Sequence, residues 1–190
     1  MVAALDPASQ VSAASIAQRF PISATARSLL GESGGNLRRF LDELLAQGLP
    51  VDALVVMARI LPRRYVVAWA CECLNSTFAR DPQTADVDRA GLALAQQWLS
   101  DPTEERRRAA LEFAEGGEFE TPGAWIAASA GWSGASLAPR GYDAIVPPDH
   151  LPAEAALAAL RLTASRAAEY ATLVSGFVAR GLQIFGASGR

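Results

Sequence analysis

Apolar residues recur at helical spacing along nearly the whole chain, and this spacing limits the fold more than any other feature. Between residues 37 and 45 the apolar positions fall at i, i+3, i+4, i+7 and i+8, with charged residues between them. Asn36 is a suitable cap for the start of this helix, and Gly48 is a suitable stop. The alternating pattern of a half-buried strand does not compete convincingly. The sequence therefore predicts an all-α fold.

Proline, glycine and capping residues divide the pattern into about eight or nine helices. Asp101-Pro102-Thr103-Glu104 is typical of a helix start, with Asp101 as the N-cap, and Thr121-Pro122 repeats that signature. The helix after Pro62 is apolar nearly all round, so we expect it to be the central and most buried one. The segment from Pro152 to about Phe185 is one long helix or two helices with a kink near Ser165. Further helices are expected around residues 12–20, 23–30, 50–61 and 87–98.

A long irregular segment, residues 132–151, interrupts the helices. Loops of this length are usually functional or disordered. Its apolar residues favour a loop that packs down on the helices, and the pattern leaves open whether the loop is functional or only structural. These residues are Trp132, Leu137, Tyr142, Ile145 and Val146.

The length of 190 residues and the 51% apolar content are enough for one domain with a real core. Short connections favour antiparallel neighbours, and no repeat of fixed period is present. We therefore expect an irregular helical bundle over residues 1–190. Within this domain, a C-terminal helical hairpin is possible. It would comprise residues 152–186 and pack on residues 20–132.

The charge balance argues against several classes of partner. The net charge is −3 and the pI is about 5.2, whereas proteins that neutralise phosphates normally carry a basic excess. Nucleic acid and anionic membranes are therefore poor candidates. The N-terminal residues show no secretory signal, and no run of about eighteen apolar residues exists. We expect a soluble cytoplasmic protein without membrane insertion.

Few residues can supply catalytic or metal chemistry. The chain has one histidine, two cysteines and no lysine, so all its seventeen basic residues are arginines. Most enzymes use His, Lys or a reactive Cys to move protons or form covalent intermediates. Cys71 and Cys73 point about 200° apart on a helix, so they can neither bridge each other nor close a tetrahedral site. No metal and no cofactor are expected.

One motif is consistent with an enzyme. Gly131-Trp132-Ser133-Gly134-Ala135 matches a loosened nucleophile elbow, and His150 could act as its base. An elbow requires a strand before the serine, but the residues before Gly131 have a helical pattern. A small hydrolase using Ser133 and His150, or acids such as Glu72 and Asp149, stays an alternative. So does a ligand-binding helical domain with a deep pocket lined by Trp69 or Trp125.

The arginines and tryptophans suggest a contact surface instead. Arg63 and Arg64 lie in the first turn of a helix and oppose its dipole, so they pair with distant acids or face an anionic partner. The run Arg106-Arg107-Arg108 is predicted to be a solvated face, with Glu104–Arg108 and Arg108–Glu112 pairs. The candidate partner surface comprises Arg63, Arg64, Trp125, Trp132, Ser133 and Tyr142.

Four segments of the chain match motifs of one known family. They are Phe20-Pro21-Ile22-Ser23 with residues 26–30, Leu61-Pro62-Arg63-Arg64 with residues 67–70, Asp101-Pro102 with residues 107–110, and Thr121-Pro122-Gly123-Ala124-Trp125 leading to residues 132–139. Together these segments resemble an uncharacterised bacterial helical domain family of unknown function, over about residues 20–160. The resemblance implies a protein that occurs near type VI secretion components, and it carries no catalytic residues. We therefore expect a non-catalytic protein-interaction or adaptor module, an accessory of a bacterial secretion system with a protein partner.

Overall fold

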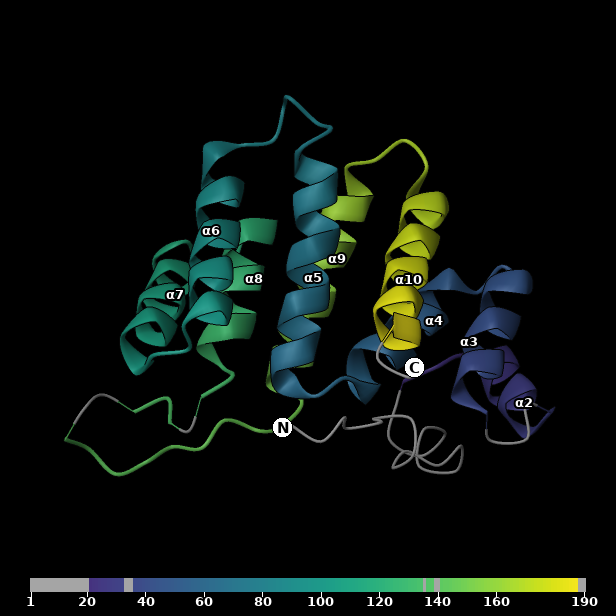
Figure 1. The fold of residues 1–190 in the computed structure, drawn as a ribbon, viewed down its shortest axis with the longest axis horizontal. Helices are drawn as coiled ribbons and strands as arrows, with labels where there is room; N and C mark the ends of the chain where they lie inside the picture. Colours follow the sequence, from purple (N-terminus) through teal and green to yellow (C-terminus); the bar gives the residue numbers. More distant parts are fainter. Residues whose placement is uncertain (1–20, 33–35, 135, 139–140, 188–190) are drawn as a thin grey trace. The chain divides into compact units, whose positions relative to one another are not determined.

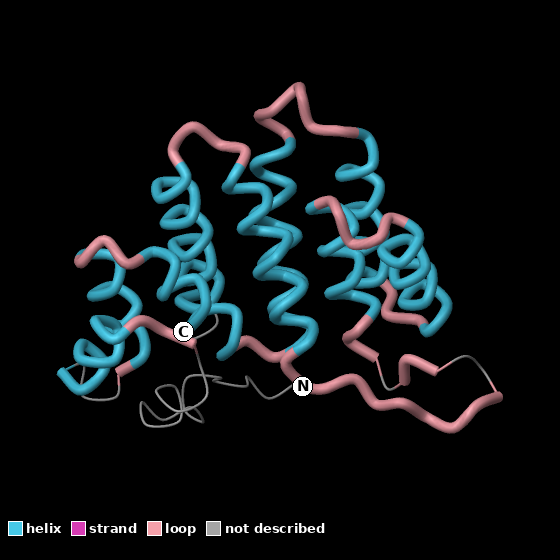
Figure 2. Tube along the Cα trace, turned by 180° about the vertical axis from the view of Figure 1, so that it is seen from behind, coloured by secondary structure: helices cyan, strands magenta, loops and turns pink. Residues whose placement is uncertain are grey.

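The computed structural model describes residues 21–32, 36–134, 136–138 and 141–187. These residues form nine α-helices and no strand, which confirms the all-α prediction (Figures 1 and 2). The predicted helix at residues 12–20 lies outside the described residues. The C-terminal helical pattern is two helices, because α9 ends at Ser165 and α10 begins at Tyr170.

The chain divides into two compact units. Unit 1 combines Met1–Pro62 with Ala167–Arg190, and unit 2 is Arg63–Arg166. Helix α9 therefore belongs to unit 2 and α10 to unit 1. The single domain over residues 1–190 and the hairpin over residues 152–186 stay predictions.

Unit 1 contains four described helices. The Asn36 side chain accepts a hydrogen bond from the Arg39 amide at 2.9 Å and caps α3, as its position in the sequence predicted. Gly48, with φ of +69°, follows that helix. Helices α4 and α10 pack closely, because a Cβ at Gly181 would lie 2.9 Å from the Met57 sulfur. The four helices are α2 (Ala24–Glu32), α3 (Leu37–Ala46), α4 (Pro50–Ile60) and α10 (Tyr170–Ala187).

Unit 2 contains five helices and the long loop. Helix α7 starts two residues later than predicted, with Thr103 as its N-cap in place of Asp101. Asp101 instead ends α6, since its amide donates to the Gln97 carbonyl at 3.1 Å. Thr121 caps α8 as predicted, accepting from the Ala124 amide at 3.0 Å. The five helices are α5 (Arg63–Phe78), α6 (Asp86–Ser100), α7 (Glu104–Gly116), α8 (Pro122–Gly131) and α9 (Leu151–Ser165).

The most buried helix of unit 2 is α8, and the prediction that α5 would be was wrong. Nine of the ten residues of α8 are buried, against eight of sixteen in α5. The cause is side-chain size, since glycine and alanine let α8 pack against α6, α7 and α9 at once (Figure 1). A Cβ on Gly123 would lie only 2.6 Å from the Asp88 Cα atom. Helix α5 keeps a face open, where Tyr65 is exposed.

Candidate functional site: a loop anchored by arginines

The loop between α8 and α9 is fixed to the first residue of α5. Arg63 donates to the Gly134 and Pro147 carbonyl oxygens, each at 3.3 Å, and forms an ion pair with Asp149. These acceptors come from both ends of the loop. The interpretation of Arg63 as paired with a distant acid therefore matches its contacts, and its guanidinium is committed to the loop.

Arg107 of α7 holds the same loop from a buried position. Only 2% of its side chain is exposed, so the prediction of a solvated face was wrong for this residue. Its guanidinium makes two hydrogen bonds of 2.7 Å to the two carboxylate oxygens of Glu104. It also donates to the Gly131 carbonyl and, at 2.7 Å, to the Ser136 carbonyl. Carbonyl groups at the end of a helix lack hydrogen-bond donors within that helix. An arginine side chain has five N–H donors and can hydrogen-bond to them.

Arg108 adds a third attachment. It donates to the Ala138 carbonyl at 2.8 Å, and its Nε lies 2.7 Å from Glu104, without the alignment of a hydrogen bond. The predicted Glu104–Arg108 pair is therefore present. The hydrogen bond from Arg107 lowers the pKa of Glu104, burial opposes that shift, and the positive charges of both arginines reinforce it. We call Arg63, Arg107, Arg108 and Glu104 the arginine anchor.

Backbone and hydroxyl contacts close the loop itself. The Leu137 amide donates to the Ile145 carbonyl at 2.8 Å. The Ser136 hydroxyl oxygen accepts from the Ala138 and Ile145 amides, each at 3.1 Å. The two arms of the loop are therefore also joined directly to each other.

The closed loop presents apolar side chains to solvent. Tyr142 is 76% exposed, Ile145 60% and Val146 66%. The expectation that these three side chains pack down on the helices was wrong, because the polar backbone of the loop faces the arginine anchor instead. Among the loop residues that the structure describes, Ala138 and Pro147 are buried. We call Tyr142, Ile145 and Val146 the loop patch.

The other candidate surface residues have separate environments. Arg64 donates to the Leu99 carbonyl at 2.8 Å. Trp125 and Trp132 are partly exposed and meet edge to face, with ring centroids 6.2 Å apart. In the described part of the chain, the Trp125 ring contacts the Trp132 ring. The Arg63 side chain hydrogen-bonds to the loop that carries Tyr142.

Ser133 follows a helix, as the sequence before Gly131 predicted. Its hydroxyl donates to the Ser129 carbonyl at 2.8 Å, so its proton caps the end of α8. A strand-to-helix turn, which lifts the serine of a nucleophile elbow, does not precede it. His150 is exposed at the N-cap position of α9.

The described residues provide little for other chemistry. Burial, reinforced by Cys73, raises the pKa of the Cys71 thiol far above its ordinary value, so the thiol stays protonated. Among these residues no group of three His, Cys, Asp or Glu side chains could hold a metal. Nor is any described helix both long and apolar enough to cross a membrane.

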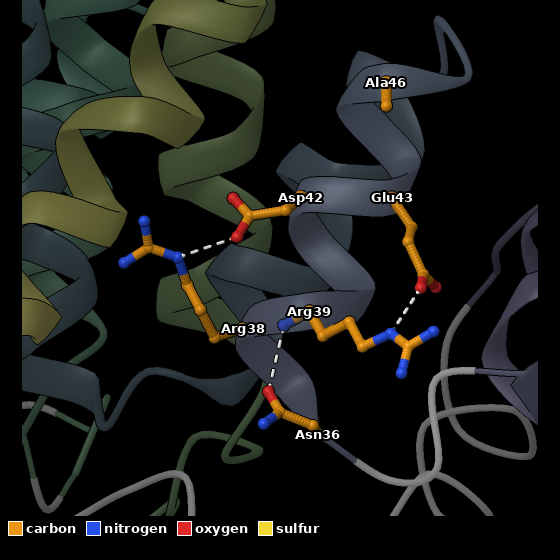
Figure 3. Close-up of a pocket in the computed structure, with 6 residues that line it drawn as sticks. All are labelled: Asn36, Arg38, Arg39, Asp42, Glu43 and Ala46. Carbon is orange, nitrogen blue, oxygen red and sulfur yellow. Dashed lines mark hydrogen bonds and ion pairs between the residues drawn. The ribbon is translucent and has the colours of Figure 1, made fainter.

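An open hollow lies along α3 in unit 1 (Figure 3). Its arginines are already paired, since Arg38 meets Asp42 at 3.0 Å on one side of the helix and Arg39 meets Glu43 at 2.7 Å on the other. A second, smaller hollow lies between α5 and α6. Neither hollow is lined by Trp69 or Trp125, the residues expected in a ligand pocket. The first is lined by Asn36, Arg38, Arg39, Asp42, Glu43 and Ala46.

The sequence analysis did not name Arg107, Arg108 and Glu104 as residues of this site, although it predicted the Glu104–Arg108 pair. The signal for Arg107 was present, because it precedes the buried Ala110, Leu111 and Ala114 at helical spacing. An arginine on the apolar stripe of a helix must find acceptors in the core or at its edge.

The comparisons with known proteins give one match. A family model described as a family of unknown function (DUF6931) matches residues 40–185, which include parts of both units. No curated protein and no solved structure matches the chain.

Proposed function

The chain belongs to the DUF6931 family, whose function is unknown, and we propose that unit 2 is a non-catalytic protein-interaction module that binds its partner through the loop patch. The observation that carries this proposal is the arginine anchor. Three arginines from two helices bind carbonyl oxygens of an irregular loop, and that loop exposes Tyr142, Ile145 and Val146. Exposed apolar groups on a fixed loop are typical of contact sites.

The energetics favour such a site. Full burial of an apolar side chain contributes about 1.5–3 kcal/mol, so the loop patch offers several kcal/mol to a partner that covers it. Association must also offset the entropy of ordering flexible segments. In unit 2 the arginine anchor and the Leu137–Ile145 hydrogen bond restrain the described part of the loop, which lowers this entropy cost.

A photoreactive amino acid at position 142 tests the proposal in native lysate. We expect one discrete adduct, whose yield falls strongly when Ile145 and Val146 are changed to serine. The same photoreactive amino acid at position 87 is the matched control, because Val87 is also exposed in unit 2 and lies outside the loop. An adduct pattern that is the same for position 87 as for position 142, or that ignores the two serine changes, contradicts the proposal.

The finer proposal is that the partner belongs to a bacterial secretion apparatus of the type VI kind. It is supported by the resemblance between the motifs given above and proteins near such components. Mass spectrometry of the position-142 adduct decides it. A secretion component in the adduct supports this role, and an unrelated partner contradicts the role while leaving the interaction surface in place.

A further inference from the structure

Unit 2 has a second surface in which three aromatic rings touch. Phe119, Trp125 and Trp132 are all partly exposed, and their ring centroids are 5.3, 5.7 and 6.2 Å apart. The two tryptophans are seven residues apart, so they share one face of α8 or its end. Because the rings contact one another, they form one cluster and not an enclosed cage. We call these three residues the aromatic cluster.

The segment that carries the aromatic cluster is acidic. Residues 109–139 contain four glutamates and no aspartate, lysine, arginine or histidine. Glu118 and Glu120 flank Phe119, and the Glu118 amide donates to the Glu115 carbonyl at 3.0 Å. All four glutamates, Glu112, Glu115, Glu118 and Glu120, are exposed.

The helix dipole adds to this negative potential. Helix α7 ends at Gly116 and carries no basic residue in its last turn, so its negative end is left uncompensated there. Glu115 in that turn is unfavourable for the helix itself. The arginines that precede the segment, Arg107 and Arg108, are committed to Glu104 and to the loop carbonyls. The segment that carries the aromatic cluster therefore has a net charge of −4, from Glu112, Glu115, Glu118 and Glu120.

The backbone fixes the position of Phe119 against local preference. Glu118 and Phe119 have φ of 49° and 58°, and they are the non-glycine residues with positive φ in the described part of the chain. Such a conformation is unfavourable for side chains of this kind. It places the Phe119 ring against Trp125 and Trp132.

We propose that the aromatic cluster, together with Glu115, Glu118 and Glu120, binds a cationic segment of a partner protein that carries arginine or lysine. Guanidinium and ammonium groups are attracted to the faces of tryptophan and phenylalanine, and guanidinium also stacks on them. Nearby carboxylates supply charge complementarity and select against anionic partners. This surface is distinct from the loop patch, and the proposal does not depend on the function assigned to that patch.

Fluorescence anisotropy with a labelled peptide of alternating arginine and glycine tests the proposal on the full chain at low salt. The triple variant Glu115→Gln, Glu118→Gln and Glu120→Gln should raise the Kd about tenfold and weaken its salt dependence. The same peptide with citrulline in place of arginine should not bind. Trp132→Leu should raise the Kd about fivefold, and Trp132→Phe should recover part of the loss.

Two controls make the result specific. The variant Asp86→Asn, Glu105→Gln removes exposed acids from the first turns of α6 and α7 and should leave the Kd unchanged. Tyr142→Ser with Val146→Ser should also leave it unchanged, which separates this surface from the loop patch. Circular dichroism confirms that each variant is folded.

Three outcomes overturn the proposal. The first is no binding of the arginine peptide by the wild-type chain, and the second is equal affinity of the wild type and the triple glutamine variant. The third is a wild-type dimer that the triple variant converts to a monomer without any peptide binding, because the occupant would then be a second copy of this chain.

Discussion

Helices α3 of unit 1 and α7 of unit 2 carry the same kind of sequence and use it in opposite ways. Each has adjacent arginines with acids one turn away, the pattern of a solvated helix face. On α3 the Arg39 side chain is 64% exposed and pairs with Glu43 of its own helix. On α7 the buried Arg107 joins its own helix to the carbonyls of a distant loop. The comparison shows that an exposed arginine pairs within its own helix, whereas a buried arginine binds a distant segment of the chain.

Replacement of Arg107 gives the largest expected effect. Arg107→Met should lower the free energy of unfolding by about 3 kcal/mol, because it leaves the Gly131 and Ser136 carbonyls without this donor and removes one of the two arginines that pair with Glu104. Urea denaturation measures the change. A loss of unfolding free energy below about 1 kcal/mol would mean that Arg107 contributes no more to stability than a surface arginine.

Removal of the Arg63 contacts should have a local effect. Arg63→Gln loses the ion pair with Asp149, which is exposed, and weakens the hydrogen bonds to the loop. We expect the loop to open about fivefold more often, and chymotrypsin to cleave after Tyr142 faster by a similar factor. Arg64→Gln, the neighbouring change, should leave the cleavage rate as it is. Equal rates for the two variants would contradict the role given to Arg63.

The charge of Glu104 should make the anchor depend on pH. Its pKa in the folded protein lies below the ordinary value of 4.5, so the stability it contributes is complete above that value and is lost as the pH falls through the folded pKa. The stability of the wild type should therefore exceed that of Glu104→Gln at pH 7, and the difference should shrink below pH 4.5. Urea denaturation of both proteins at several pH values shows whether the difference shrinks. If the stability difference between the wild type and Glu104→Gln grows as the pH falls, the lowered pKa of Glu104 is contradicted.

The smallest effect is expected on α3. Arg39→Met removes an exposed pair between residues four apart, and such pairs contribute about 0.3–0.5 kcal/mol. Urea denaturation should show a change of that size or less, and added salt should reduce it further. A loss comparable to that of Arg107→Met would remove the distinction between the two helices.

Local rules made the helices predictable, whereas the anchor depends on distant contacts. Asn36 and Thr121 were correctly identified as caps because a cap binds an amide three residues away. The sequence analysis did not predict that α8 is the most buried helix of unit 2. The small side chains of α8 matter because they let other helices approach closely, and the sequence does not show which helices do so. The arginine anchor was missed for a similar reason. Its acceptors are mostly backbone carbonyls, such as those of Gly134 and Ser136, and a carbonyl acceptor has no residue-type signature. Tyr142, Ile145 and Val146 were expected to pack inward, because an apolar side chain in the sequence does not show that the loop backbone takes the inner position.

Amide hydrogen exchange of the loop tests the central claim most directly. If three arginines hold a closed loop, the amides of Leu137 and Ile145 exchange slowly in the wild-type chain, because they donate to the Ile145 carbonyl and the Ser136 hydroxyl. The double variant Arg63→Gln, Arg108→Gln should then exchange them at least tenfold faster, while Arg38→Gln, Arg39→Gln leaves them slow. Exchange of both amides at the rate of an unprotected peptide in the wild type would contradict the account.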